Sequence, residues 1–199
     1  PQEHRVVHDY QRAAFGARTL KPTRHVRRWL QTRLTAWMQG LPYQGLVLTP
    51  RYLAQIEPQQ CPVTREVFTH DTGADTDAVV VRLNPRAAYA PGHLALLSRR
   101  VAQALGSADV EAVRAMAEQA CGQEPAAPGG LDARQWGRLA SLMSLGLAQP
   151  HERIAVMPLR VLPPNRLRLL NPVQALQALM TQLFLGEGYA RRMTAVASL

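Results

Sequence analysis

The strongest helical pattern in the chain begins at Thr23 and ends at Gly40. Thr is a common N-cap residue, and Gly commonly follows the last turn of a helix. The apolar positions between them recur at helical spacing: Val26, Trp29, Leu30, Leu34 and Trp37. The pattern predicts an amphipathic helix that buries both tryptophans and turns Arg24, Arg27 and Arg28 toward solvent.

Further helices are predicted where a capping residue precedes apolar positions at the same spacing. The candidate caps are Thr49, Ser107 or Asp109, Asp132 and Asn171, and Pro follows the first and the last of them. Weaker periodicity predicts a short helix over residues 8–15 and a linker over 123–130. Residues 187–199 form either one more helix or an irregular tail.

Residues 61–105 combine strand and helix patterns in one compact unit. A short strand is predicted over residues 66–70 and a β-branched strand over 78–83, with a polar loop between them. Pro91-Gly92 then turns the chain into a predicted helix whose buried side carries Leu94, Leu97, Val101 and Leu105. The order of these elements is that of a ββα unit.

Residues 154–170 alternate apolar residues with arginines on both sides of a Pro163-Pro164-Asn165 turn. This period of two predicts a second β-hairpin. The chain is therefore expected to form a single, predominantly helical α+β domain. Its parts are a basic helical segment (1–60), the ββα unit (61–105) and helical support with the second hairpin (106–199).

The composition fits a soluble globular protein. Of the 199 residues 47% are hydrophobic and 19% are charged, and no apolar run is long enough to span a bilayer. No secretory leader precedes the first predicted helix, so we expect a cytoplasmic protein without membrane contact. Cys61 and Cys121 form no CxxC pair, and we expect both to be reduced thiols.

The net charge of +9 and the pI near 10.7 favour an anionic partner such as nucleic acid, with DNA favoured over RNA. Lys21 is the only lysine, so nearly all of the positive charge is guanidinium, which suits phosphate; a GC-rich genome would produce the same bias. The formal charge is +6 for residues 1–60, +1 for 61–105 and +2 for 106–199. The excess is thus expected mainly on the N-terminal third.

Part of the ββα unit resembles a known nuclease family. The strings CPVT (61–64) and VVRLNPRAAYAPGHLALLSRR (80–100) are similar to the HNH endonuclease-like pattern of phage and bacterial proteins. The matching positions are Arg82, Tyr89, Gly92, Leu94 and Ser98. The resemblance is confined to residues 61–105 and implies a ββα-metal module of phage or mobile-element type.

Three polar positions of that pattern are altered in this chain. Val81 stands where the pattern has Asp, His93 where it has Asn, and Ala102 where the helix carries a further Asn. The resemblance therefore implies a degenerate module that keeps the frame and has lost part of the catalytic set.

An HNH-type site needs a histidine base to activate water and a metal ion to stabilise the leaving oxygen. His70 is the candidate base and His93 the candidate metal ligand, with Asp75 and Asp77 as carboxylate partners for Mg²⁺ or Mn²⁺. A Zn²⁺ site would need Cys61 together with both histidines and a further group. The leading expectation is that no cofactor is bound.

The sequence leaves three functions open. The leading hypothesis is a nucleic-acid-associated, non-cleaving protein whose arginines contact the phosphate backbone: Arg24, Arg27, Arg28, Arg82, Arg99 and Arg100. One alternative is an active metal-dependent HNH-type endonuclease with His70 and His93 as catalytic residues. The other is a non-enzymatic adaptor or structural subunit of a larger assembly, with a protein partner.

Overall fold

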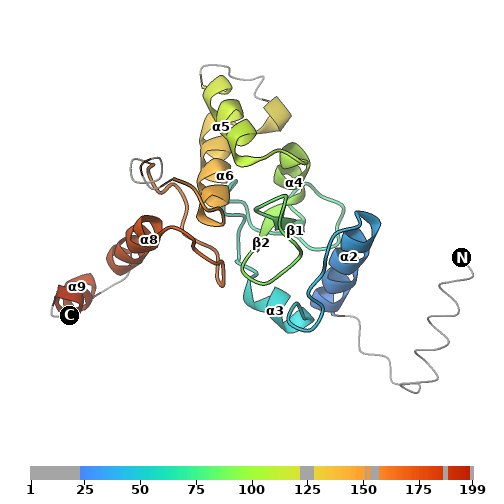
Figure 1. Ribbon diagram of the computed structural model, residues 1–199, viewed down its shortest axis with the longest axis horizontal. Helices are drawn as coiled ribbons and strands as arrows, with labels where there is room; N and C mark the ends of the chain where they lie inside the picture. Colours follow the sequence, from blue (N-terminus) through green and yellow to red (C-terminus); the bar gives the residue numbers. More distant parts are fainter. Residues whose placement is uncertain (1–22, 122–127, 151, 153–156, 186–187, 198–199) are drawn as a thin grey trace, which may run out of the picture.

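The computed structural model describes residues 23–121, 128–150, 152, 157–185 and 188–197. It has a mostly helical α+β fold with a two-stranded antiparallel sheet near its centre (Figure 1). This arrangement confirms the predicted fold class. The helix predicted over residues 8–15 lies outside the described residues, as do residues 122–127.

Five helices begin at the predicted caps. The helical elements are α2 (Arg24–Met38), α3 (Pro50–Gln55), α4 (Arg99–Leu105), α5 (Val110–Gln119), the 3-10 turn η1 (Pro128–Gly130), α6 (Ala133–Leu145), α8 (Pro172–Phe184) and α9 (Tyr189–Ala197). The side chains that accept a backbone N–H of the first turn are Thr23, Thr49, Asp109, Asp132 and Asn171. Because a cap acts within one helical turn, the local sequence is sufficient to locate these helix starts.

A ββα unit is present, but only one of its two strands is a predicted one. Its strands are β1 (Ala78–Arg82) and β2 (Leu94–Ser98), which pair antiparallel, and α4 follows β2 directly. The prediction that residues 94–98 begin a helix is therefore wrong. All five of these residues are buried, and a short apolar run of this kind fits a buried strand as well as a helix.

The strand predicted over residues 66–70 is reduced to isolated bridges. Val67 pairs with Gln60, and Thr69 pairs with Asp77, but no continuous ladder forms. The backbone N–H of Ala78 donates to the carbonyl of Thr69 at 3.1 Å. This segment therefore runs up to the start of β1 and brings His70 to that end of the hairpin.

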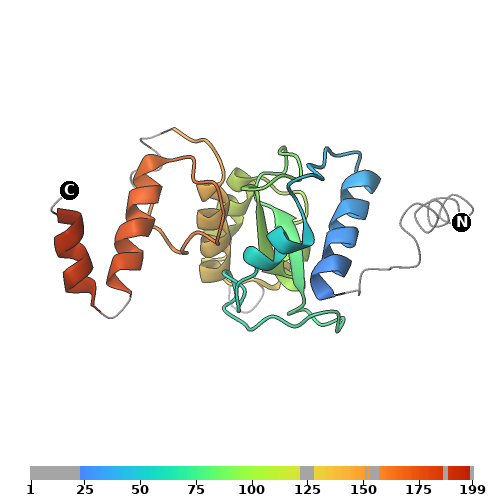
Figure 2. The ribbon, with the colours of Figure 1, turned by 90° about the horizontal axis from the view of Figure 1, so that it is seen from below.

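The core forms around β2 and α6. Figure 2 shows α2 on one side of the sheet and α5 with α6 on the other. The fully buried side chains of α6 include Trp136, Leu139, Leu142 and Met143. The sheet is thus covered by helices on both sides, which explains why no residue of β2 reaches solvent.

Helix α2 faces the sheet with a different side from the one predicted. Its buried residues are Arg28, Thr32 and Ala36, whereas Trp37 is 77% exposed and Leu34 is 48% exposed. Arg28 was expected in solvent, so that prediction is wrong. A buried ion pair, described below, holds Arg28 inside, and the small neighbours four residues apart let α2 pack closely.

The second β-hairpin is absent from the described part of residues 154–170, which is 157–170. The backbone N–H of Arg160 donates to Ser141 Oγ at 3.2 Å, and that of Arg168 donates to the Gly92 carbonyl at 3.0 Å. The two halves of the segment are thus hydrogen-bonded to different parts of the molecule and not to each other. Pro158, Pro163 and Pro164 also lack the N–H that a ladder needs.

Helices α8 and α9 lie at the end of the molecule opposite α2 (Figures 1 and 2). The buried residues of α8 are Gln174 and Ala178, while Leu176 is 60% exposed and Phe184 is 56% exposed. The predicted apolar stripe of this helix is therefore largely on the surface. Among the described residues, the helices are all too short or too polar to cross a membrane.

Candidate functional site

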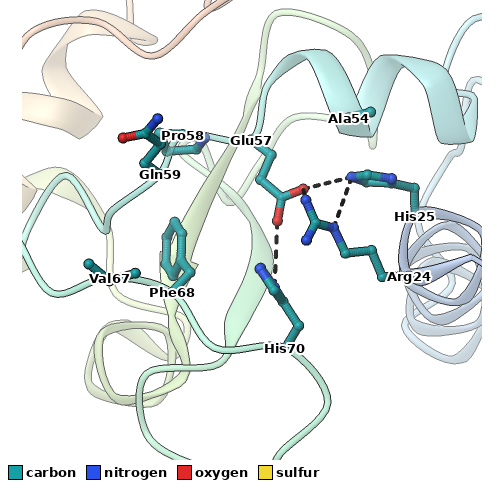
Figure 3. A pocket seen from close by; sticks show the side chains of 9 residues that line it. All are labelled: Arg24, His25, Ala54, Glu57, Pro58, Gln59, Val67, Phe68 and His70. Carbon is teal, nitrogen blue, oxygen red and sulfur yellow. Dashed lines mark hydrogen bonds and ion pairs between the residues drawn. The ribbon is translucent and has the colours of Figure 1, made fainter.

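A pocket of about 420 Å³ lies where α2, the end of α3 and residues 66–70 meet (Figure 3). It contains the largest group of facing titratable side chains that we find in the described part of the chain. Glu57 comes from the segment after α3, His25 and Arg24 from α2, and His70 from the segment before the polar loop. Apolar groups, including Phe68, close one side of the pocket.

The carboxylate of Glu57 is the centre of this cluster. Its Oε2 lies 2.7 Å from His25 Nε2 and 3.5 Å from Arg24 Nη2, and its Oε1 lies 3.1 Å from Arg28 Nη1 and 3.5 Å from His70 Nδ1. Arg28 Nη2 also lies 3.2 Å from His70 Nδ1. The side chain of Glu57 is only 7% exposed, so one buried carboxylate connects three segments of the chain.

The surroundings of Glu57 keep it ionised. Burial alone would raise the pKa of this carboxyl group, but hydrogen bonding from His25 and the guanidinium charges of Arg28 and Arg24 outweigh it and lower the pKa below the ordinary value. A metal cation placed here would meet the charge of Arg28, which already contacts both Glu57 and His70. The arrangement fits a structural ion-pair cluster, which holds α2 against the end of α3, better than a metal centre.

Asp77 is a second buried carboxylate, and hydrogen bonds within the chain occupy it. It accepts hydrogen bonds from the hydroxyls of Thr69 (2.7 Å) and Thr72 (2.8 Å), from the N–H of Gly73 (2.8 Å) and from Arg99 Nη2 (3.1 Å). Burial raises the pKa of Asp77, but these hydrogen bonds dominate and hold it well below its ordinary value. Asp77 therefore holds the loop over residues 69–77 in place and has little room for a metal ion.

The hairpin separates the two candidate catalytic histidines. His70 lies beside Thr69, which pairs with Asp77 before β1 begins, whereas the carbonyl of His93 accepts the N–H of Leu83 after β1 ends. From Asp77 to Leu83, across the five residues of β1, the chain advances six residues, which is about 20 Å at a rise of about 3.3 Å per residue. His70 and His93 therefore do not share one site.

The predicted metal ligands are likewise not brought together. Asp75 is exposed, Asp77 is buried, and His93 lies at the far end of the hairpin. In the described ranges, no group of three or more His, Cys, Asp or Glu side chains has the geometry to hold a metal ion. Cys61 is buried, and its sulfur accepts the N–H of Ser98 at 3.4 Å.

The predicted phosphate-binding arginines all have partners inside the protein. Arg27 donates twice to Asp71, with Nη2 at 2.6 Å, and Arg100 donates to Glu66 at 3.2 Å. Arg82 Nη1 donates to two backbone carbonyls of the loop after β1, and its guanidinium lies 5.0 Å from the ring centre of Tyr89. The remaining three are Arg24 and Arg28 at Glu57, and Arg99 at Asp77.

The charge of this region is therefore nearly balanced. Five of the six arginines pair with four carboxylates, Glu57, Glu66, Asp71 and Asp77, which leaves these groups a formal charge of +1. The sequence count for residues 1–60 gave a large excess because it assigned the acidic loop residues to another segment. Among the described residues, folding pairs Arg24, Arg27 and Arg28 of this segment with Glu57 and Asp71.

Sequence reasoning missed His25 and Glu57 as site residues. They lie 32 positions apart, and neither belongs to a recognisable spacing with His70. The local sequence holds one hint of this cluster, Arg28 near the start of α2. Together with Arg24 and Arg27 it was predicted to face solvent. Only the packing of α2 against the end of α3 reveals the cluster.

Comparison with known proteins gives no family for this chain, since no family model, curated protein or solved structure matches it. The resemblance of residues 61–105 to HNH endonucleases therefore rests on the motif positions and stays a prediction.

Proposed function

We propose that this chain is a nucleic-acid-associated protein with a degenerate, non-cleaving HNH-like ββα module. The observation that carries the proposal is the net charge of +9, which favours binding to the phosphate backbone through counterion release. DNA is favoured over RNA, and the proposal includes the cytoplasmic location expected from the sequence. Nothing in the arrangement favours base-specific recognition.

The placement of the histidines supports the non-cleaving part of the proposal. A base and a metal ligand must both lie within a few ångströms of the same phosphate. His70 and His93 lie at opposite ends of β1, and His70 is engaged by Glu57 and Arg28. The altered positions Val81 and Ala102 supply no polar group in exchange.

Some of the six predicted arginines remain available to phosphate. Arg24, Arg27 and Arg99 have side chains that are between 41% and 49% exposed. The partner of Arg27, Asp71, is itself 44% exposed, and exposed ion pairs contribute only about 0–1 kcal/mol, so a phosphate can replace this carboxylate at little cost. The partners of Arg24 and Arg99, Glu57 and Asp77, are buried and keep these two arginines more firmly. Arg28 and Arg82 hold the fold together and are not proposed as contacts.

Binding and cleavage assays test this proposal together. We expect the chain to bind duplex DNA in dilute buffer with an affinity that falls steeply as salt is added. We expect intact plasmid after incubation with Mg²⁺, Mn²⁺ or Zn²⁺. Cleavage that is lost in both His70→Ala and His93→Ala would establish the endonuclease alternative, and absence of binding in dilute buffer would remove both nucleic-acid functions.

The exposed apolar residues of α8 favour a second candidate, a structural subunit or adaptor in a larger assembly. Leu176, Leu179 and Phe184 are all at least 47% exposed on one helix. Contiguous exposed apolar surface commonly marks an interface. Light scattering would detect self-association that Leu176→Ser with Leu179→Ser abolishes; a monomeric wild-type chain that binds DNA equally well with both substitutions contradicts this candidate.

A further inference from the structure

We propose that the main contact with the nucleic-acid backbone is a carboxylate-free basic surface around Gly92, formed by Arg51, Arg86, Arg166 and Arg168. We call it the Gly92 surface. It shares no residue with the arginines that the sequence predicted. This inference rests on the proposed function and names the part of the molecule that performs it.

Three segments that are far apart in the sequence meet at Gly92. Its backbone N–H donates to Tyr52 Oη in α3 at 2.9 Å, and its carbonyl accepts the N–H of Arg168 at 3.0 Å. Asn165 Nδ2 donates to the carbonyl of Gln55 at 2.6 Å, which joins the third segment to α3 directly. Figure 1 shows residues 157–170 passing close to α3 and to the loop between β1 and β2.

Each segment contributes exposed arginine and no acidic residue. Arg51 is exposed on α3, Arg86 in the loop after β1, and Arg166 and Arg168 in the third segment. Residues 49–56, 83–93 and 157–171 contain no Asp or Glu. Within the described residues, none of these four guanidinium groups forms an ion pair.

This composition distinguishes the Gly92 surface from the rest of the molecule. Five of the six predicted arginines pair with carboxylates, so a phosphate that approaches them must displace a partner and is repelled by the neighbouring acids. At the Gly92 surface there is no carboxylate to displace. The same number of contacts therefore yields a stronger attraction for a polyanion.

The backbone around Gly92 is held closely enough to fix the spacing of the arginines. A Cβ on Gly92 would lie 2.9 Å from Arg168 Cβ, and the φ of Gly92 is +86°. Leu167, between Arg166 and Arg168, packs partly against the core, while both arginines are exposed. The backbone that carries Arg166 and Arg168 is therefore packed against the rest of the protein and is not a free loop.

Nucleic acid fits this surface better than an anionic membrane. Arginine forks bind phosphate oxygens in a bidentate manner, which suits a regularly charged backbone. Stable attachment to a bilayer also needs apolar side chains inserted beside the charges. Within residues 49–56, 83–93 and 157–171, the exposed neighbours of the arginines include Asn165, and the one exposed large apolar residue is Leu170 at 37%. Leu46 and Val47, which precede α3, are also exposed, so the vesicle arm of the test below is needed.

Matched triple variants of the full chain test the inference. The first is Arg51→Gln with Arg166→Gln and Arg168→Gln; the control is Arg65→Gln with Arg134→Gln and Arg191→Gln. Each set removes three exposed arginines, and each contains one at positive φ, Arg166 at +60° and Arg65 at +67°. Thermal unfolding of both variants is compared with that of the wild type, so that a folding defect is recognised.

Binding to a fluorescent duplex DNA is then measured against salt concentration. The first variant is expected to bind at least about tenfold more weakly at low salt, with a salt slope shallower by about 0.9 for each lost phosphate contact. The control variant is expected to keep nearly the wild-type affinity and slope. Single-stranded RNA and phosphatidylserine vesicles serve as competitor probes.

The outcomes separate the inference from the proposed function. Equal weakening of both variants, or no weakening in either, overturns the Gly92 surface while wild-type binding still supports the proposed function. Failure of the wild type to bind DNA in dilute buffer overturns both. Preferential binding of RNA or of vesicles through the same three arginines overturns the choice of duplex DNA.

Discussion

Glu57 shows how much one side chain organises in this protein. Its carboxylate joins α2 to the end of α3 and to His70, and it neutralises the buried Arg28. Glu57→Gln keeps the shape but leaves Arg28 without its charge partner, so we expect a loss of about 3–5 kcal/mol in the free energy of unfolding. Urea denaturation monitored by tryptophan fluorescence measures this loss.

The matched control for Glu57 is Glu66→Gln. The side chain of Glu66 is 45% exposed and pairs with Arg100 at 3.2 Å. We expect this change to cost less than about 1 kcal/mol, as for other exposed ion pairs. Similar losses of unfolding free energy in the two variants would show that Glu57 does not hold these segments together.

The two buried carboxylates also predict a pH dependence. The pKa values of Glu57 and Asp77 in the folded protein lie below their ordinary values of 4.5 and 3.8. Each group therefore contributes stability above its ordinary pKa, and this contribution is lost as the pH falls through that value toward the folded pKa. The free energy of unfolding should decrease from about pH 5 downward, with a smaller slope in Asp77→Asn; an equal slope in that variant contradicts the assignment to Asp77.

At the scale of elements, the hairpin β1–β2 and residues 157–170 depend on each other through Gly92. In Gly92→Ala, the alanine must adopt φ near +86°, and its Cβ would lie 2.9 Å from Arg168 Cβ. We expect a loss of about 2–4 kcal/mol in stability, because steric displacement adds to a backbone cost of about 1–2 kcal/mol. Thermal or urea unfolding provides the measurement.

Gly73→Ala is the control that measures the cost of the positive φ alone, without a steric contact. Gly73 has φ of +82°, and no atom lies within 4 Å of the position that its Cβ would take. This variant is expected to lose only the backbone cost of about 1–2 kcal/mol. Equal losses at the two glycines would show that the contact with Arg168 is not tight.

At the scale of the whole molecule, the positive charge is redistributed by folding. The sequence places the largest excess in residues 1–60, but α2 in that segment pairs with the acidic loop at residues 71–77 through Arg27 and Asp71. The surface without carboxylates arises at the other end of the hairpin, from α3 and residues 157–170. The salt dependence of DNA binding in the matched variants above reports on this distribution.

The sequence alone was sufficient for the features that depend on local interactions. The caps Thr23, Thr49, Asp109, Asp132 and Asn171 could be predicted because each interacts with residues within a few positions. The predicted strand over residues 78–83 is confirmed as β1. Residues 94–98 were assigned to a helix because an apolar run of five residues has no periodicity of its own. Pairing with β1 makes them a strand.

What the sequence by itself determined about this protein is five of the helix starts, the mostly helical α+β class and the net charge of +9. The tertiary structure decided which side of α2 faces inward, that Arg28 and Glu57 form one buried cluster, and that His70 and His93 lie apart. It also decided which arginines are neutralised and which remain exposed without carboxylates. The physical reason is that ion pairing and strand pairing join residues distant in the chain, and their partners exist only after packing.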